Sequence, residues 1–147
     1  MHLGELISSF LNNLQSLCRS SIFLKNTSFQ QITGIVSLDY EGMEMSSLSL
    51  KLGIDNSTAT RLVLGLEKKG WVARKKNKSD NRIVVVYLTD SGKAVQKELE
   101  NQFDKFGEEI KNQIPTEESD SIFNSLNTLN WVLTKVKMET DNVVPCK

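Results

Sequence analysis

The side chains best suited to chemistry form a polar run followed by a basic run. Hydroxyl, amide and guanidinium groups, which bind base edges and phosphates, gather at Asn56, Ser57, Thr58, Thr60 and Arg61. A second group, rich in cations, follows at Lys75, Lys76, Lys78 and Arg82, with Asp80 among them. This mixture of donors and cations is better suited to binding a polyanion than to catalysis.

The charge of the chain is distributed unevenly. Its 147 residues include 18 basic and 18 acidic side chains, and a neutral total would normally argue against a polyanionic partner. From Arg61 to Arg82, however, eight basic and two acidic residues give a net charge of +6, which leaves −6 for the remainder. A solvated charge run would look the same, but its place behind a helix-turn-helix pattern favours an electrostatic footprint for DNA.

Residues for enzyme chemistry are scarce. The single histidine, His2, lies beside the first residue, so a catalytic triad built on it is improbable. Cys18 and Cys146 are isolated, without the paired spacing of a zinc site or a disulfide framework. There is no phosphate-binding glycine loop either. We therefore expect a protein that is not an enzyme and needs no metal or cofactor.

The polar run is positioned by two short helices. Apolar spacing predicts the first over residues 48–54, with Gly53 turning the chain out of it and Ser46 or Ser47 able to cap it. Asp55 is a natural N-cap for the second, which should run to Lys69 and stop at Gly70. The spacing assigns a core face and a polar face to this helix: Ala59, Leu62, Val63 and Leu66 on the first, and Ser57, Thr58, Arg61, Gly65 and Lys68 on the second.

The basic run is predicted to lie on a two-stranded hairpin. Residues 71–74 and 82–88 are rich in β-branched and aromatic side chains, and turn-forming residues separate them. Two helices followed by a charged hairpin indicate a winged helix-turn-helix, a mainly α fold with a small β-hairpin wing. Its partner would be double-stranded DNA.

Each candidate residue has an expected role in that complex. Short hydroxyls and an arginine near a helix N-terminus can reach the major groove, so Ser57, Thr58, Thr60 and Arg61 are the primary candidates and Asn56 is a secondary one. Arg82 is the expected minor-groove contact of the wing, and Lys75, Lys76 and Lys78 should meet phosphates. Asp80 would orient Arg82 by a charge-assisted hydrogen bond; a local salt bridge that closes the turn is compatible with this role.

The combined spacing of Leu66-Glu67-x-x-Gly70, Asp80-x-Arg82 and Leu88-Thr89-x-x-Gly92 resembles the MarR family of bacterial transcriptional regulators. The resemblance implies a dimeric winged-helix protein, in which small molecules, often phenolic, or oxidants loosen DNA binding. Two departures are visible: Ser49 stands where the family usually has Ala, and Gly65 interrupts the recognition helix where a polar residue is common. Glycine there costs about 1 kcal/mol relative to alanine, although it would allow the backbone to approach DNA closely.

Long amphipathic helices flank this region. A helix is predicted over residues 28–40. Three longer helices, one near each end and one that begins near Thr89, are marked by apolar stripes: Leu3, Ile7, Phe10, Leu14 and Leu17; Val95, Leu99, Phe103, Phe106 and Ile110; and Ile122, Leu126, Leu129, Leu133 and Val136. The three stripes are more than one small domain can bury. The resemblance implies that they form an intertwined homodimer whose recognition helices lie about 34 Å apart on a pseudo-palindrome.

The predicted organisation is a helical dimerisation region at 1–27 and 103–140, a winged domain at 28–102 and a flexible tail at 141–147. The chain shows neither a signal peptide nor an apolar run long enough for a membrane span, so we expect a cytoplasmic protein that makes no membrane contact.

The resemblance implies two kinds of signal that could control DNA binding, a small molecule or an oxidant. A small aromatic or phenolic effector could enter a cleft between the winged domain and the helical dimerisation region, but the residues that could line it are each more often part of a core: Phe10, Leu14, Phe23 and Tyr40. Cys18 suggests a redox switch. Its place in an apolar stripe argues against this, because it predicts that the thiol is buried, and a buried thiol is usually inert. We expect a repressor. The alternative is a winged-helix protein-interaction module without DNA binding, but that would have lost the charge that this recognition face and wing retain.

Overall fold

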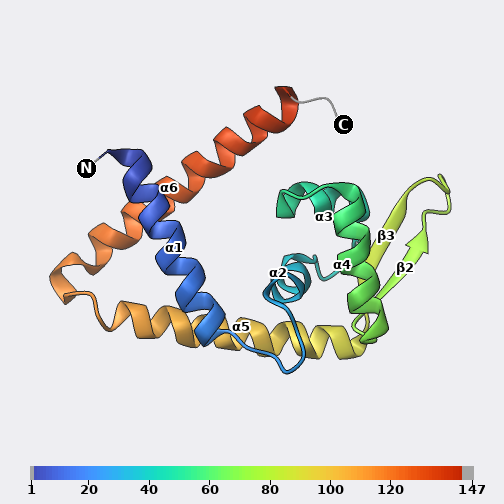
Figure 1. Ribbon diagram of the computed structural model, residues 1–147, viewed down its shortest axis with the longest axis horizontal. Coiled ribbons are helices and arrows are strands. Elements are labelled where there is room, and N and C mark those ends of the chain that lie inside the picture. Colours follow the sequence, from blue (N-terminus) through green and yellow to red (C-terminus); the bar gives the residue numbers. More distant parts are fainter. Residues whose placement is uncertain (1, 144–147) are drawn as a thin grey trace. The chain divides into compact units, whose positions relative to one another are not determined.

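The computed structural model describes residues 2–143 and divides into two compact units after Phe106. The first unit carries a helix-turn-helix and a small sheet (Figure 1). Its helices and strands run in the order α1 (Leu3–Ser21), α2 (Phe29–Ser37), β1 (Met43–Glu44), α3 (Met45–Leu52), α4 (Asn56–Lys68), β2 (Val72–Lys76), β3 (Val84–Leu88) and α5 (Asp90–Lys111), of which α5 continues into the second unit, followed there by α6 (Thr116–Val143). The mainly α fold with a β wing is as predicted.

The helix α2 is shorter than the predicted 28–40. Ser28 caps its start, because its hydroxyl accepts from the Gln31 N–H while the Gln31 side chain accepts from the Ser28 N–H. At the other end, the buried Gln96 amide of α5 donates to the carbonyls of Ile35 and Leu38 at 2.9 and 2.8 Å. These bonds satisfy end carbonyls of the helix and so tie α5 to α2.

The sheet has one strand more than the predicted hairpin. The short β1 pairs with β3, and β3 pairs with β2 from Val72 opposite Leu88 to Lys76 opposite Val84. Because β1 leads directly into α3, the cap of α3 is Glu44, earlier than the predicted Ser46 or Ser47. The sequence did not reveal a two-residue strand, since so short a segment has no periodicity.

The helix-turn-helix is formed largely as its residues indicate. Gly53 ends α3 in the left-handed conformation, with φ at 67°, and Asp55 caps α4. The four predicted core residues of α4 are all buried: Ala59, Leu62, Val63 and Leu66. Gly65, in contrast, does not lie on the polar face, because a Cβ built there would be 2.8 Å from Nε2 of Gln31 in α2. The space that a side chain would take here is occupied by the end of the Gln31 side chain.

The motif Leu88-Thr89-x-x-Gly92 fixes α5 against the turn between α4 and β2. The Thr89 hydroxyl donates to the Gly70 carbonyl at 2.6 Å and accepts from the Gly92 N–H at 3.0 Å. A Cβ on Gly92 would lie only 1.8 Å from the Trp71 carbonyl oxygen. Only glycine allows this contact between two backbones.

The second unit is dominated by α6, which begins after Pro115 and extends through Val143. It thus includes the first residues of the predicted tail, while residues 144–147, among them Cys146, lie outside the described part of the chain. Within residues 2–143, no helix combines the length and the apolarity that crossing a bilayer would require.

Candidate nucleic-acid interface

The first turn of α4 carries a network of short polar side chains around Asp55. The hydroxyls of Ser57 and Thr58 both donate to the Asp55 carboxylate, and the Thr58 backbone N–H donates to it at 2.8 Å. The bonds from Ser57 and Thr58 hold the pKa of this carboxyl far below its ordinary range. Two predicted contact residues therefore point their protons at Asp55 and offer their oxygen lone pairs to an approaching ligand.

The other candidates on α4 differ in their freedom. The Thr60 hydroxyl donates to the Asn56 carbonyl one turn earlier, at 2.8 Å. Arg61 is exposed. Within the described residues, its guanidinium makes a single long hydrogen bond, 3.5 Å from Nη2 to the Thr58 hydroxyl oxygen. Leu64 also lies exposed one turn beyond Arg61. From the sequence, Leu64 is assigned to neither the core face nor the polar face of this helix.

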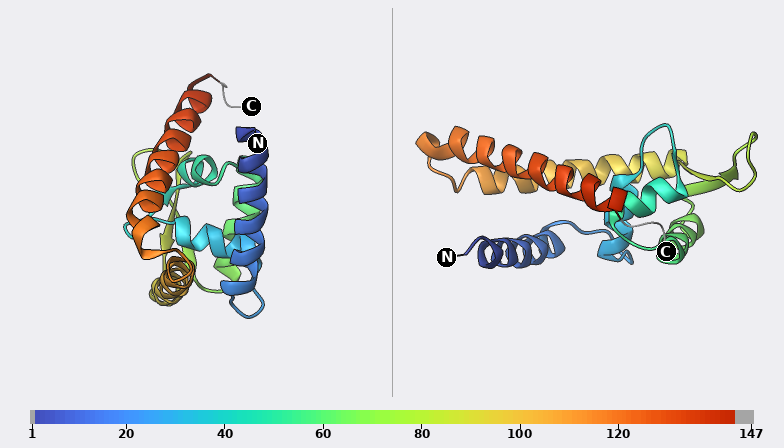
Figure 2. Two further views of the ribbon diagram at one scale, coloured as in Figure 1. Left: turned by 90° about the vertical axis from the view of Figure 1, so that its left-hand side faces the viewer. Right: turned by 90° about the horizontal axis from the view of Figure 1, so that it is seen from above.

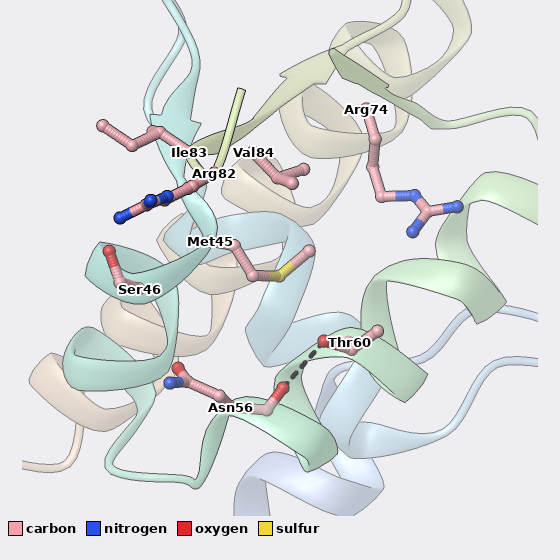
Figure 3. A pocket seen from close by; sticks show the side chains of 8 residues that line it. All are labelled: Met45, Ser46, Asn56, Thr60, Arg74, Arg82, Ile83 and Val84. Carbon is pink, nitrogen blue, oxygen red and sulfur yellow. Dashed lines mark hydrogen bonds between the residues drawn. The ribbon is translucent and has the colours of Figure 1, made fainter. Parts of the chain in front are cut away.

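A concavity of about 310 Å³ lies between α4, the recognition helix, and the wing (Figure 3). In Figure 3, Asn56 and Thr60 of α4 lie on one side, Arg82 and Arg74 on the other, and Met45 between them. The remaining lining residues are Ser46, Ile83 and Val84. The fold thus brings Asn56 and Thr60 to the same site as Arg82, while Ser57, Thr58 and Arg61 lie outside the concavity.

The wing turn is organised by side chains that bond to nearby backbone. The Asp80 carboxylate accepts from the Arg82 backbone N–H at 3.0 Å, and Asn77 accepts from the Ser79 N–H at 2.8 Å. The predicted bond from Asp80 to the Arg82 guanidinium is not among the contacts of the described residues. An Asp side chain reaches the backbone two residues on with little loss of entropy, so Asp80 shapes the turn instead of holding the guanidinium.

Some of the basic side chains of α4 and the wing already contact other groups of this chain. Arg74 is paired with Glu67 of α4, 3.0 Å from Nη2 to Oε2, and Lys69 bonds to the loop before α2 through the Asn26 carbonyl. Lys75 lies 5.4 Å from the centre of the Tyr87 ring. The exposed cations at the wing tip are Lys76, Lys78 and Arg82. Figure 2 shows the hairpin that carries them projecting from the helices of this unit.

Chemistry of other kinds has little support in the described residues. No group of three or more histidine, cysteine or carboxylate side chains lies close enough there to hold a metal ion. Cys18 is buried in the core, and burial raises the pKa of its thiol, which lowers the fraction of reactive thiolate. His2 caps α1 together with Glu5.

The fold and this surface define a winged helix-turn-helix DNA-binding protein. Comparison with known proteins narrows the class. Residues 37–84 match the model of the MarR family. The regulator SarZ of Staphylococcus haemolyticus, an HTH-type transcriptional regulator, is 35% identical over 70% of this chain and 67% of its own length. The chain belongs to the MarR family, whose members that match it are named as regulators and not as enzymes.

Solved structures agree with this assignment over most of the chain. A MarR transcriptional regulator from Methanosarcina mazei Go1 is 25% identical, with a TM-score of 0.77 over 91% of this chain and 97% of its own. Streptococcus pneumoniae FabT, solved in complex with DNA, is 22% identical, with a TM-score of 0.74 over 91% and 96%. These values show a shared fold.

Proposed function

We propose that this chain is a sequence-specific transcriptional repressor that binds a pseudo-palindromic operator as a homodimer. In this proposal α4 enters the major groove and the wing reaches the minor groove, so the protein acts in the cytoplasm, where bacterial DNA lies. The observation that carries the proposal is the concavity in which Asn56 and Thr60 of α4 meet Arg82 of the wing. The complex of FabT with DNA supports it, because the two proteins share this fold.

The predicted contacts fall into two groups in this proposal. Residues near the start of α4 read bases, and cations of the wing supply affinity: Asn56, Ser57, Thr58, Thr60 and Arg61 in the first group, and Lys75, Lys76, Lys78 and Arg82 in the second. Of the four cations in the second group, Arg82 is the one that lines the concavity. Asp80 keeps the wing turn in the shape that presents Arg82.

Homodimer formation is supported by the terminal helices, each considered alone. Seven large apolar side chains of α1 are 37–67% exposed in the single chain, and seven of α6 are 40–66% exposed. Stripes of this length are rarely left in water. We assign residues 1–27 and 103–140 to the dimerisation region and 28–102 to DNA binding.

An effector site is proposed in the first unit. A cavity of about 210 Å³ lies between the end of α1 and the start of α2, lined by Arg19, Ile22, Phe23, Thr27, Phe29 and Ile32. The Arg19 guanidinium stands 5.1 Å from the centre of the Phe29 ring. Two aromatic rings and one cation suit a small aromatic or phenolic compound of single-ring size.

The test is fluorescence-polarisation binding of the purified protein to the DNA just upstream of its own coding region. The titration is run at two salt concentrations, with random duplex as competitor. We expect tight binding that weakens with salt and survives the competitor. Equal affinity for both duplexes would refute sequence specificity. No binding at low salt would favour a protein-interaction module.

A further inference from the structure

A buried hydroxyl connects the two helices of the helix-turn-helix. Ser49 of α3 is only 5% exposed, and its Oγ lies 2.8 Å from the Ser46 carbonyl oxygen and 2.8 Å from Oδ1 of Asn56. Asn56 is the first residue of α4 and is itself exposed. An interior residue thus bonds to a side chain on the proposed DNA-binding surface.

One hydrogen bond of this contact can orient the Asn56 side-chain amide. Ser49 has a single proton, and two oxygen atoms lie within reach of it, the Ser46 carbonyl and Asn56 Oδ1. When the proton goes to Oδ1, that end of the Asn56 carboxamide is tied to the buried serine. The Nδ2 amino group is then left as the donor of a carboxamide whose residue lines the concavity shared with Thr60 and Arg82.

We propose that Ser49 is a positioning residue for base recognition: it fixes the Asn56 carboxamide so that Nδ2 donates to an acceptor on the major-groove edge of a base. Purine N7, guanine O6 and thymine O4 are such acceptors. The proposal rests on the proposed DNA-binding function. A side chain ordered before binding loses less entropy in the complex, which favours directional base contacts.

A purely structural brace between α3 and α4 predicts something different. It would change the stability of the fold and weaken binding to every duplex alike. The packing of Leu48, Val63 and Leu66, all buried, already joins these helices without the hydroxyl. Positioning instead predicts an effect that passes through Asn56 and concerns one base pair.

The experiment combines a double-mutant cycle with modified bases. A duplex is selected from a random pool by the wild-type protein, and its affinity is measured for Ser49→Ala, Asn56→Ala and the double variant, with the exposed Ser47→Ala as a matched control on the same helix. We expect each single variant to bind about five-fold more weakly, as for the loss of one hydrogen bond. The double variant should match Asn56→Ala, and Ser47→Ala should match the wild type.

Purines of the selected duplex are then replaced one at a time by 7-deaza analogues, and each thymine and guanine by an analogue without its O4 or O6 acceptor. One replacement should weaken the wild type and leave Asn56→Ala unaffected, with a reduced effect on Ser49→Ala. Should Ser49→Ala fail to fold, Ser49→Cys keeps the volume with a weaker donor and takes its place in the cycle.

Three results would overturn the inference alone: independent, additive losses in the cycle, an equal loss on random duplex, or a lower salt slope for Asn56→Ala without any base-specific response, which is the signature of a phosphate contact. If the wild-type protein enriches no sequence from the pool, the proposed function fails, and the inference fails with it.

Discussion

The winged region and the terminal helices carry similar apolar patterns but bury them to very different extents. In the winged region Ile35, Leu48 and Leu66 are fully buried. In α1 and α6, side chains at the same kind of spacing are open to solvent, with Phe10 47% and Leu133 52% exposed. Amphipathic periodicity therefore indicates that a helix has an apolar face, but not whether its own chain covers it. The winged region buries its apolar side chains within one chain, whereas those of α1 and α6 stay exposed, as the proposed homodimer would require.

The strongest test of the self-contained region is Gly92→Ala. The added Cβ would collide with the Trp71 carbonyl, and neither backbone can move without breaking the bonds of Thr89. We expect the free energy of unfolding to fall by about 4 kcal/mol or more, as for other severe substitutions, when measured by urea denaturation.

Gly107→Ala is the matched control for Gly92→Ala, because it lies in the same helix with open space around its Cβ. Alanine should stabilise a helix interior there by about 0.5–1 kcal/mol. Similar effects of the two substitutions would contradict the assigned role of the Gly92 contact.

The complementary test addresses the uncovered face of α1. Phe10→Glu places a charge in the exposed stripe, and we expect the dimer to dissociate while the winged region stays folded. Operator affinity should fall by about 100-fold or more, because one half-site would then be bound without its neighbour. Mass from light scattering and circular dichroism would be followed together.

Asn12→Glu adds the same charge to α1 outside the apolar stripe and should remain dimeric. If Phe10→Glu also remained dimeric with full operator affinity, the exposed stripe of α1 would not be the interface. The comparison of the two regions would then hold for α6 alone.

A smaller effect is expected at the wing. Arg82→Ala should weaken operator binding by about ten-fold and reduce the salt slope by about one, because one cation near the duplex is lost. Arg82→Lys separates charge from shape: it should restore the slope but not the full affinity if the guanidinium enters a narrow minor groove. Full recovery by lysine would instead indicate a phosphate contact.

Local chemistry made much of the winged region predictable from the sequence. The cap at Asp55, the turn at Gly53 and the core face of α4 each depend on residues within a few positions, and the structure confirms all three. The contact of Gly65 with Gln31 could not be predicted in this way, because Gln31 lies on another helix. The link between Ser49 and Asn56 was likewise hidden, since a buried serine becomes informative only when its partner is known.

The smallest predicted effect concerns pH and the cap of α4. The pKa of Asp55 is lowered in the folded state below its ordinary value of 3.8, chiefly by the hydroxyls of Ser57 and Thr58. A lowered folded pKa means that the carboxylate stabilises the fold fully above pH 3.8 and loses this contribution as the pH falls further toward the folded pKa. Wild type and Asp55→Ala should therefore differ most in urea midpoint near neutral pH and converge in acid. Asp55→Asn, a good cap that does not titrate, should stay close to the wild type at neutral pH and surpass it in acid. A constant difference between wild type and Asp55→Ala at all pH values would mean that the charge of Asp55 contributes nothing to this network, and that the first turn of α4 depends on the remaining contacts alone.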